Sequence, residues 1–257
     1  MPLATRAVLV GCLLVAAGCS RPTPPAAALP GEPVVLQLNW FPEAEHGGFY
    51  TADIERHYAA EGLAVEVRPG GRAIRVAGEL ASGRVQFAVA NAEDVVIFRS
   101  QGADVVTVMT ACQHHPRCIL TRADSGVRAF GDLGAKEMTL QVQQGHAFVE
   151  YMRSKGVLAG VKEVPFTGGV ALTVGDPSFA QQGYVYSEPL LARQQGVAIT
   201  TLMVSDLGFD PYSSVLVTTG TLVRERPDLV RRMVAGRSPA GTGISPIRRR
   251  PTPGSSR

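Results

Sequence analysis

Residues 34–67, VVLQLNWFPEAEHGGFYTADIERHYAAEGLAVEV, contain the pattern that decides the fold. A β-rich run (34–40) is followed by a helical segment (48–60) that stops at Gly62, and a second β-rich run (63–69) begins directly after it. Strands that alternate with helices at this spacing are typical of βα units around a mostly parallel sheet. This stretch therefore predicts an α/β protein.

The same alternation continues along the chain and restarts after residue 125. The first block continues with helix 73–82, strand 85–90, helix 92–101 and strand 104–111. The second block contains strand 139–143, helix 145–156, strands 162–166 and 183–187, helix 188–196 and strand 199–205, and the chain goes on with strand 214–219 and helix 221–235. Two successive blocks predict two lobes with a cleft between them. We expect lobe 1 at 34–124, lobe 2 at 125–206 and a return segment to lobe 1 at 207–235.

Composition and charge exclude several classes of protein. Of the 257 residues, 45% are hydrophobic and 18% charged, which excludes a disordered chain. The net charge of +3 is concentrated at the end, where residues 236–257 hold five arginines and no acid. The body is therefore mildly acidic, which argues against a nucleic-acid-binding protein. Residues 236–257 are expected to be a disordered basic tail, either functional or the product of a truncated or frameshifted coding sequence.

The first 33 residues predict export. Residues 1–18 combine an early arginine with an apolar run too short to span a bilayer, as in a secretory signal peptide. Small residues directly before Cys19 match a bacterial lipobox, in which this cysteine becomes the lipidated first residue of the mature protein. An ordinary signal peptide with a chance cysteine is the alternative. The proline-rich segment 19–33 would then tether a body anchored in the membrane and facing the periplasm or the extracellular side.

Candidate ligand contacts in lobe 1 lie where the predicted strands end, because open α/β sheets bind ligands at the carboxyl ends of their strands. Trp40, the only tryptophan, offers a flat stacking surface there, with Asn39 and Phe41 on either side; a core role for Trp40 is the alternative. His46 opens the next helix, where it could donate to a ligand or simply be solvated, and Tyr50 is placed on the same wall.

Two further polar residues follow the predicted strand 85–90. Asn91 and Asp94 are candidate ligand contacts, or alternatively a helix cap and a first-turn acid. In lobe 2, alternation along strand 183–187 places Tyr184 and Tyr186 on one face. Glu188 begins the next helix. Gln143-Gln144-Gly145, where strand 139–143 ends, takes in lobe 2 the part that Asn91 and Asp94 have in lobe 1.

The segment ACQHHPRCIL (111–120) contains Cys112 and Cys118. In an oxidising compartment these two cysteines could form a disulfide. The same segment offers two cysteines and two histidines to a metal, but its tight spacing on an extended loop argues against a tetrahedral zinc site, and no metal is predicted. Two unpaired thiols are the third interpretation.

Residues 34–62 strongly resemble the start of ABC-importer substrate-binding proteins related to thiamine pyrimidine synthase and to sulfonate-binding proteins. Further similarity lies in ASGRVQFAVANAEDV (81–95), FGDLGAK (130–136), FAQQGYVYSEP (179–189) and DLGFDPYSSVLVTT (206–219). The resemblance implies a two-lobed periplasmic-binding-protein-like fold that closes on a small ligand and delivers it to an inner-membrane ABC permease. Such proteins usually continue for several helices beyond the point matched here, so the chain is expected to be C-terminally truncated, and a defective remnant is one hypothesis.

The resemblance also implies a ligand class. Relatives that bind pyrimidine precursors of thiamine contact them through the region of Tyr184, Tyr186 and Glu188, so a small heteroaromatic solute is expected; flavins, sulfonates and nitrate-like solutes are the alternatives. A thiamine-pyrimidine-synthase-like enzyme is the competing function. That enzyme uses a lysine-bound cofactor, a sacrificial histidine and a cysteine-rich motif, for which this sequence has no convincing equivalents. We therefore expect a monomeric binding protein without catalytic residues or cofactor.

Overall fold

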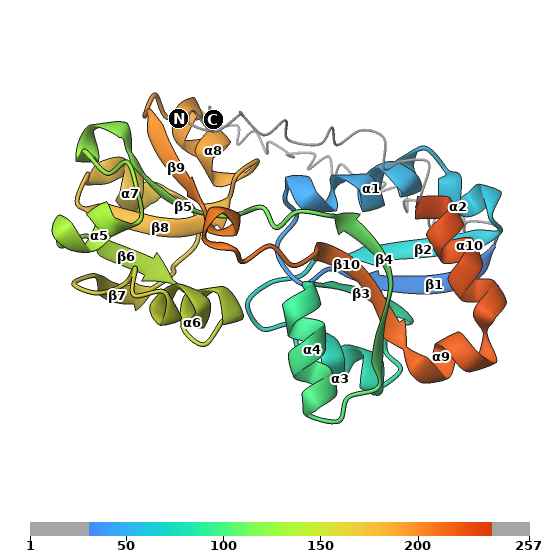
Figure 1. Ribbon diagram of the computed structural model, residues 1–257. Helices are drawn as coiled ribbons and strands as arrows, with labels where there is room; N and C mark the ends of the chain where they lie inside the picture. Colours follow the sequence, from blue (N-terminus) through green and yellow to red (C-terminus); the bar gives the residue numbers. More distant parts are fainter. Residues whose placement is uncertain (1–30, 238–257) are drawn as a thin grey trace, which may run out of the picture.

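The computed structural model describes residues 31–237, which form two lobes side by side (Figure 1). Each lobe is built on one five-stranded sheet flanked by helices. The predicted α/β class with two mostly parallel sheets is confirmed.

The sheet of lobe 1 has four parallel strands and one antiparallel strand. β2 pairs with β1 and β1 with β3 in parallel, whereas β10 lies antiparallel between β3 and β4. In sheet order the strands are β2 (Leu63–Arg68), β1 (Glu32–Gln37), β3 (Phe87–Ala90), β10 (Ser213–Thr219) and β4 (Val105–Cys112).

The sheet of lobe 2 repeats this arrangement. β7, β6 and β8 are parallel, and β5 lies antiparallel between β8 and β9. In sheet order the strands are β7 (Lys162–Pro165), β6 (Thr139–Val142), β8 (Phe179–Tyr184), β5 (Arg117–Arg122) and β9 (Ile199–Met203). In both lobes the antiparallel strand is the one that has just crossed from the other lobe.

Apolar helix faces cover the lobe 1 sheet. The helices are α1 (Gly47–Ile54), α2 (His57–Ala60), α3 (Val76–Ala81), α4 (Ala92–Ser100), α9 (Gly220–Glu225) and α10 (Pro227–Arg237), with the 3-10 turn η1 (Ala44–His46) before α1. Phe49, Tyr58 and Met233 join α1, α2 and α10 to the strands in one core cluster. Leu80 and Val95 join α3 and α4 to the strands in a second cluster.

Two predicted single helices are each divided in two. Segment 48–60 breaks at Arg56, whose φ of 62° is left-handed, and segment 221–235 breaks at Arg226, just before Pro227. Proline has no N–H to continue the preceding helix but fits the first turn of a new one, so the second break follows from the sequence.

The helices of lobe 2 are shorter. They are α5 (Gly131–Ala135), α6 (Ala147–Ser154), α7 (Ala171–Gly175) and α8 (Glu188–Gln194), with the 3-10 turns η2 (Ala123–Ser125) and η3 (Val204–Leu207). α6 buries Phe148, Val149 and Met152 in the main core of the lobe. This burial holds α6 beside the end of β6.

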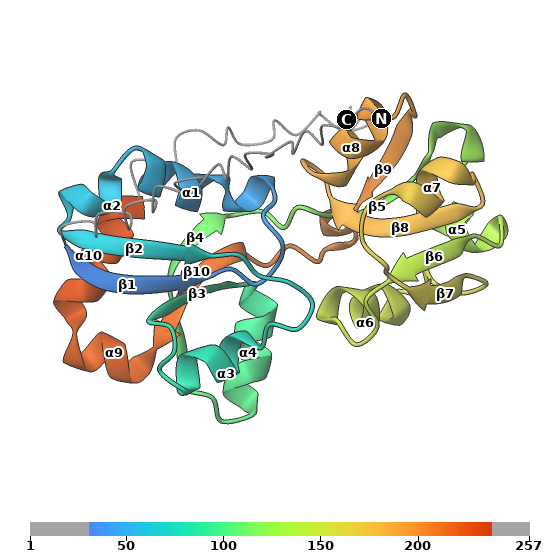
Figure 2. The same cartoon turned by 180° about the vertical axis from the view of Figure 1, so that it is seen from behind.

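Two segments connect the lobes, residues 113–116 between β4 and β5 and residues 208–212 between η3 and β10 (Figures 1 and 2). Asp210 joins them: its carboxylate accepts a hydrogen bond of 2.7 Å from the His115 backbone N–H and forms a 2.9 Å pair with the His114 ring. The lobe boundary predicted after residue 124 is wrong, because β5 already pairs within the second sheet. The sequence RCILTR lacks the alternation that would have revealed this buried strand.

The predicted signal peptide, lipidation at Cys19 and most of the tether and tail lie outside the described residues. The predicted start of the tail at residue 236 is wrong, because Gly236 and Arg237 are buried residues of α10. The Arg237 guanidinium lies 4.6 Å from the centre of the Phe49 ring. Within residues 31–237, no helix combines the length and apolarity needed to cross a membrane.

Candidate functional site

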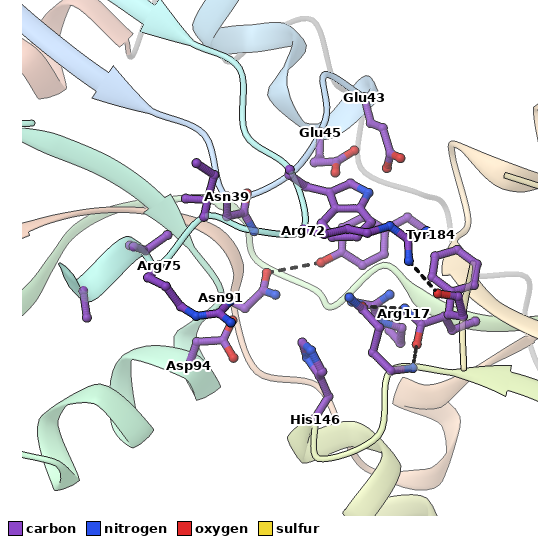
Figure 3. A pocket seen from close by; sticks show the side chains of 18 of the residues that line it. Asn39, Glu43, Glu45, Arg72, Arg75, Asn91, Asp94, Arg117, His146 and Tyr184 are labelled. Carbon is purple, nitrogen blue, oxygen red and sulfur yellow. Dashed lines mark hydrogen bonds between the residues drawn. The ribbon is translucent and has the colours of Figure 1, made fainter. Parts of the chain in front are cut away.

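A cavity of about 420 Å³ opens between the two lobes (Figure 3). Its walls are residues that follow β1 and β3 in lobe 1 and residues at the ends of β5, β6 and β8 in lobe 2. Three aromatic side chains line it, those of Trp40, Phe98 and Phe166. The polar lining residues are Asn39, Glu43, Glu45, Arg72, Arg75, Asn91, Asp94, Gln101, Arg117, Gln143, His146, Gln182, Tyr184 and Glu188. Its size suits a small organic molecule.

Trp40 forms part of the lobe 1 wall. It is half-buried, and its ring meets Phe41 edge-on at 5.4 Å between centroids. Phe41 is 51% exposed and lines a neighbouring cavity of about 360 Å³, which shares Trp40 and Arg72 with the main one. The indole is thus a surface on which a flat ligand could stack.

Arg72 reaches from lobe 1 to lobe 2 across the cleft opening. Its guanidinium lies 5.9 Å from the Trp40 ring centroid and donates hydrogen bonds to the backbone carbonyls of Phe166, at 3.0 Å, and Thr167. Arg72 lines both cavities, and Figure 3 shows its side chain among those of the main one. Sequence patterns missed Arg72 because it lies in a loop between elements and its partners are more than 90 residues away.

The expectation that His46 contacts a ligand is wrong. The ring is fully buried, its Nδ1 accepts from the Glu43 backbone N–H at 3.3 Å, and its Nε2 lies 3.1 Å from Asn39 Oδ1. Burial lowers the pKa of His46 to about 4, so the ring is neutral at physiological pH and donates through Nε2. His46 therefore orients Asn39, which does line the cavity.

Asn91 occupies the N-cap position of α4, but its side chain does not cap the helix. Its Oδ1 instead accepts from Ser213 Oγ at 2.8 Å. It also accepts from the Tyr184 hydroxyl at 3.2 Å, the bond drawn in Figure 3. Asp94, one turn later, lines the cavity, and burial raises the pKa of its carboxyl to about 6.

Glu188 folds back from the start of α8 onto the end of β8. Its Oε2 accepts from the Tyr184 backbone N–H at 2.7 Å, and the residue is 7% exposed where it lines the cavity. This approach requires Gly183, because a Cβ there would lie 2.8 Å from Glu188 Oε2 and 2.5 Å from Leu120.

Two other predicted contacts, Tyr50 and Tyr186, line neither cavity. Tyr50 packs against the lobe 1 core. β8 ends at Tyr184, so the strand alternation expected for 183–187 stops there and Tyr186 turns away, with its hydroxyl 3.3 Å from Cys112 Sγ. The two tyrosine rings pack edge-on at 6.0 Å between centroids, but only Tyr184 lines the cavity, so they do not face a ligand together.

The predicted Cys112–Cys118 disulfide is also absent, and both thiols are free. Cys112 ends β4 in lobe 1 and contacts Tyr186, whereas the buried Cys118 thiol donates to the Gly183 carbonyl at 3.4 Å in lobe 2. The two histidines between them also diverge, His114 to Asp210 and His115 to Glu93. The lobe crossing inside this short segment explains the separation.

Carboxyl groups dominate the wall around Trp40. Burial, followed by the charge of Glu188, raises the pKa of Glu43 to about 7; burial, followed by the charge of Glu43, raises that of Glu45 to about 8. Burial also raises the pKa of Glu188. Near neutral pH this wall thus contains carboxyls that can donate as well as accept.

The lobe 2 wall is held by amide pairs. Gln182 Nε2 donates to Gln143 Oε1 at 2.8 Å, and Gln182 Oε1 accepts from the Gln143 backbone N–H at 2.7 Å. Beside them His146 lines the cavity, and burial lowers its pKa. Arg117, the first residue of β5, completes this wall; sequence reasoning missed it because it expected a loop there.

Comparison with known proteins agrees with this architecture. Residues 43–240 match the protein family described as NMT1/THI5 like. The chain belongs to the NMT1/THI5-like family. The match covers both lobes, and the resemblance recognised in the sequence is thereby confirmed at the level of the family.

This member of the NMT1/THI5-like family is also similar to individual proteins. It is 27% identical over 250 residues to the riboflavin-binding protein RibY of Chloroflexus aurantiacus, covering 90% of this chain and 70% of that protein. Its fold is similar to the periplasmic aliphatic sulphonate-binding protein SsuA of Escherichia coli (TM-score 0.60, 15% identity, 82% and 69% of the two chains). It is equally similar in fold to the alkanesulfonate-binding SsuA of Xanthomonas axonopodis pv. citri (TM-score 0.60, 14% identity, 82% and 74%). These likenesses confirm the periplasmic-binding-protein fold.

Proposed function

We propose that this chain is the extracytoplasmic solute-binding protein of an ABC importer and that it holds a small heteroaromatic solute between its lobes. The observation that carries the proposal is the 420 Å³ cavity, to which both lobes contribute polar side chains around the half-buried Trp40. Two connecting segments allow a hinge motion that would open and close such a site.

The relatives support a binding function in a general way. RibY is named for riboflavin and SsuA for sulfonates, so related proteins with this fold are binding proteins with different ligands. An aminopyrimidine precursor of thiamine and a flavin are the two ligand classes to test first. Both present a flat ring for Trp40 together with ring nitrogens that polar groups can bind.

The enzyme alternative finds less support in the cleft. A cofactor bound as in thiamine pyrimidine synthase would need a lysine facing the cavity. The lysines of this chain, Lys136, Lys155 and Lys162, are all in lobe 2, and none lines the cavity. Absorbance of bound pyridoxal phosphate and iron-dependent turnover by the purified chain would contradict the binding proposal.

Tryptophan fluorescence provides a direct test, because Trp40 is the only tryptophan. Titration of the full chain with riboflavin and with 4-amino-5-hydroxymethyl-2-methylpyrimidine should quench the emission for at least one of them. The same ligand should raise the Tm, since it binds the folded form.

Variants then separate stacking from general effects. Trp40→Ala should weaken binding by about 10- to 100-fold in calorimetry, as expected for a lost ring-stacking surface. Trp40→Phe should keep most of the affinity. Tyr212→Ala is the matched control, since Tyr212 is an exposed aromatic residue outside the cavity. Equal affinities of Trp40→Ala and the unmodified chain would contradict the proposed site.

We further propose that Cys19 carries a lipid that tethers the body to the membrane. The support is the leader sequence of small residues before this cysteine. Incorporation of a labelled fatty acid should be lost in Cys19→Ser and retained in Cys12→Ser, the control within the same leader. Labelling that persists in Cys19→Ser would contradict the anchor.

A further inference from the structure

Arg117 is a buried cation on the cavity wall. The residue is only 9% exposed. Its guanidinium carbon lies 4.4 Å from the centroid of the Tyr184 ring and 4.7 Å from that of Phe148. These two rings hold the guanidinium in place and leave its edge as the part that can make hydrogen bonds. Figure 3 shows Arg117 among the side chains that line the cavity.

That edge is not used within the protein. Among residues 31–237, the Arg117 side chain makes no hydrogen bond or ion pair, and its buried Nε lacks a partner. Its charge acts through space on Glu43, Glu45 and Glu188, where it opposes the rise in the pKa of each carboxyl. A buried charge without acceptors destabilises a fold, whereas a bound ligand that supplies acceptors removes that cost. The position on the wall of the 420 Å³ cavity makes such a ligand possible.

The other charges around the cavity indicate what kind of acceptor fits. Four carboxyl groups line it, those of Glu43, Glu45, Asp94 and Glu188, against three arginines. Arg72 already donates to two backbone carbonyls. An oxyanion on Arg117 would share the cavity with the ionised Asp94 and with Glu43, whose pKa of about 7 leaves it partly ionised at neutral pH, and this repulsion is unfavourable.

We infer that Arg117 binds the acceptor edge, a carbonyl oxygen or ring nitrogen, of an uncharged heteroaromatic ligand whose N–H groups face the glutamates of the opposite wall. The inference rests on the proposed function and specifies its ligand class. A guanidinium presents two parallel N–H donors, which match adjacent acceptors of a flat ring. An uncharged ligand class excludes alkanesulfonates as the preferred ligand, although a protein of similar fold is an alkanesulfonate-binding protein.

The test compares three probes on the full chain by calorimetry: riboflavin, 4-amino-5-hydroxymethyl-2-methylpyrimidine and hexanesulfonate. At least one uncharged probe should bind, and hexanesulfonate should bind at least about 100-fold more weakly, as expected when a buried charge lacks a matching partner. Arg117→Met should lose about 100-fold in affinity for the bound probe and Arg117→Lys about 10-fold. Arg122→Met is the control, since Arg122 is at the other end of β5 and pairs with Asp124.

A purely structural role for Arg117 would give a different result. If the arginine serves the ligand, the ligand-free Arg117→Met protein should melt at about the same temperature as the unmodified chain, because removal of a buried charge without hydrogen-bond acceptors offsets the loss of its contacts with the Tyr184 and Phe148 rings. A lower Tm with unchanged affinity would overturn the inference.

The remaining outcomes separate the inference from the proposed function. Preference for hexanesulfonate, lost in Arg117→Met, would overturn the uncharged class and leave a solute-binding cleft in place. Binding of an uncharged probe that is insensitive to Arg117→Met but lost in Trp40→Ala would overturn the role of Arg117 alone. Failure of all three probes to bind would overturn both proposals.

Discussion

The hydroxyl of Tyr184 donates to Asn91 Oδ1 at 3.2 Å. Tyr184 ends β8 in lobe 2 and Asn91 follows β3 in lobe 1, so this buried hydrogen bond joins the lobes at the cavity wall. Both side chains line the cavity, yet each already has a protein partner. A ligand that used them would have to compete with this bond.

Tyr184→Phe should therefore affect stability more than binding. Loss of one hydrogen bond of this kind costs about 1 kcal/mol, which lowers the Tm by about 2–4 °C in a chain of this size. Ligand affinity should change by less than about threefold. Differential scanning fluorimetry and calorimetry check the two effects, with exposed Tyr212→Phe as control. An unchanged Tm with a large loss of affinity would show that the hydroxyl serves the ligand.

Removal of the Arg72 bridge should speed ligand release. Arg72→Ala deletes both hydrogen bonds from lobe 1 to the Phe166 and Thr167 carbonyls, so the closed arrangement is less favoured. We expect the dissociation rate to rise by about 10-fold, as for one or two lost charged hydrogen bonds. Stopped-flow measurement of Trp40 fluorescence checks this.

Arg68→Ala is the matched control for that measurement, because exposed Arg68 pairs only locally with Glu66. A release rate of Arg72→Ala equal to that of the control would show that the bridge does not hold the lobes together.

Stability should fall with rising pH because of Glu45. Burial raises the pKa of this carboxyl from 4.5 to about 8. Between these values the folded chain retains a proton that the unfolded chain has lost, so the free energy of unfolding decreases as pH increases. Glu45→Gln should remove the contribution of Glu45 to this dependence, so the Tm advantage of the variant over the unmodified chain should grow from pH 5 to pH 8, by about 3 °C or more.

Thermal melts at several pH values measure that difference, with exposed Glu225→Gln as control. His46 has the opposite effect on the pH dependence of stability. Burial lowers the pKa of His46 from 6.5 to about 4, so its contribution to the free energy of unfolding is lost as the pH falls from 6.5 towards 4. A difference between Glu45→Gln and the unmodified chain that is independent of pH would contradict the buried, protonated carboxyl.

Gly183→Ala should disturb the cavity wall. The added methyl group would meet Leu120 at 2.5 Å and Glu188 Oε2 at 2.8 Å, so the Glu188 carboxyl must move away from the Tyr184 N–H. We expect about 1–3 kcal/mol of destabilisation, as for overpacking of a core, together with weaker ligand binding. Gly175→Ala, where the new methyl group meets open space, should leave the Tm nearly unchanged in the same assay.

Sequence patterns located most of the elements that form the cavity. The strands before Asn39 and Asn91 were predicted from β-rich runs, and the rule that ligands bind beyond strand ends then placed both residues and Trp40 on the cavity wall. Asp94, Tyr184 and Glu188 also line it. Local pattern was sufficient here because strand direction alone decides which residues emerge at that edge.

The errors arose where a side chain's surroundings come from distant parts of the chain. His46 looked accessible at a helix start, yet it is buried against Asn39 and the backbone of Glu43. Tyr186 and the two cysteines were misplaced because the extents of β8 and β5 depend on pairing with each other. Periodicity in one strand cannot show where its partner stops.

By itself the sequence determined the α/β class, the two lobes and the family, because hydrophobic periodicity and motif order are properties of the chain taken in a line. Only the tertiary structure decided which polar groups remain available to a ligand. Asn91 and Tyr184 bind one another, whereas Arg117 lies between Tyr184 and Phe148 without an acceptor. Such pairing depends on distances between residues far apart in sequence, and those distances exist only after the lobes have packed.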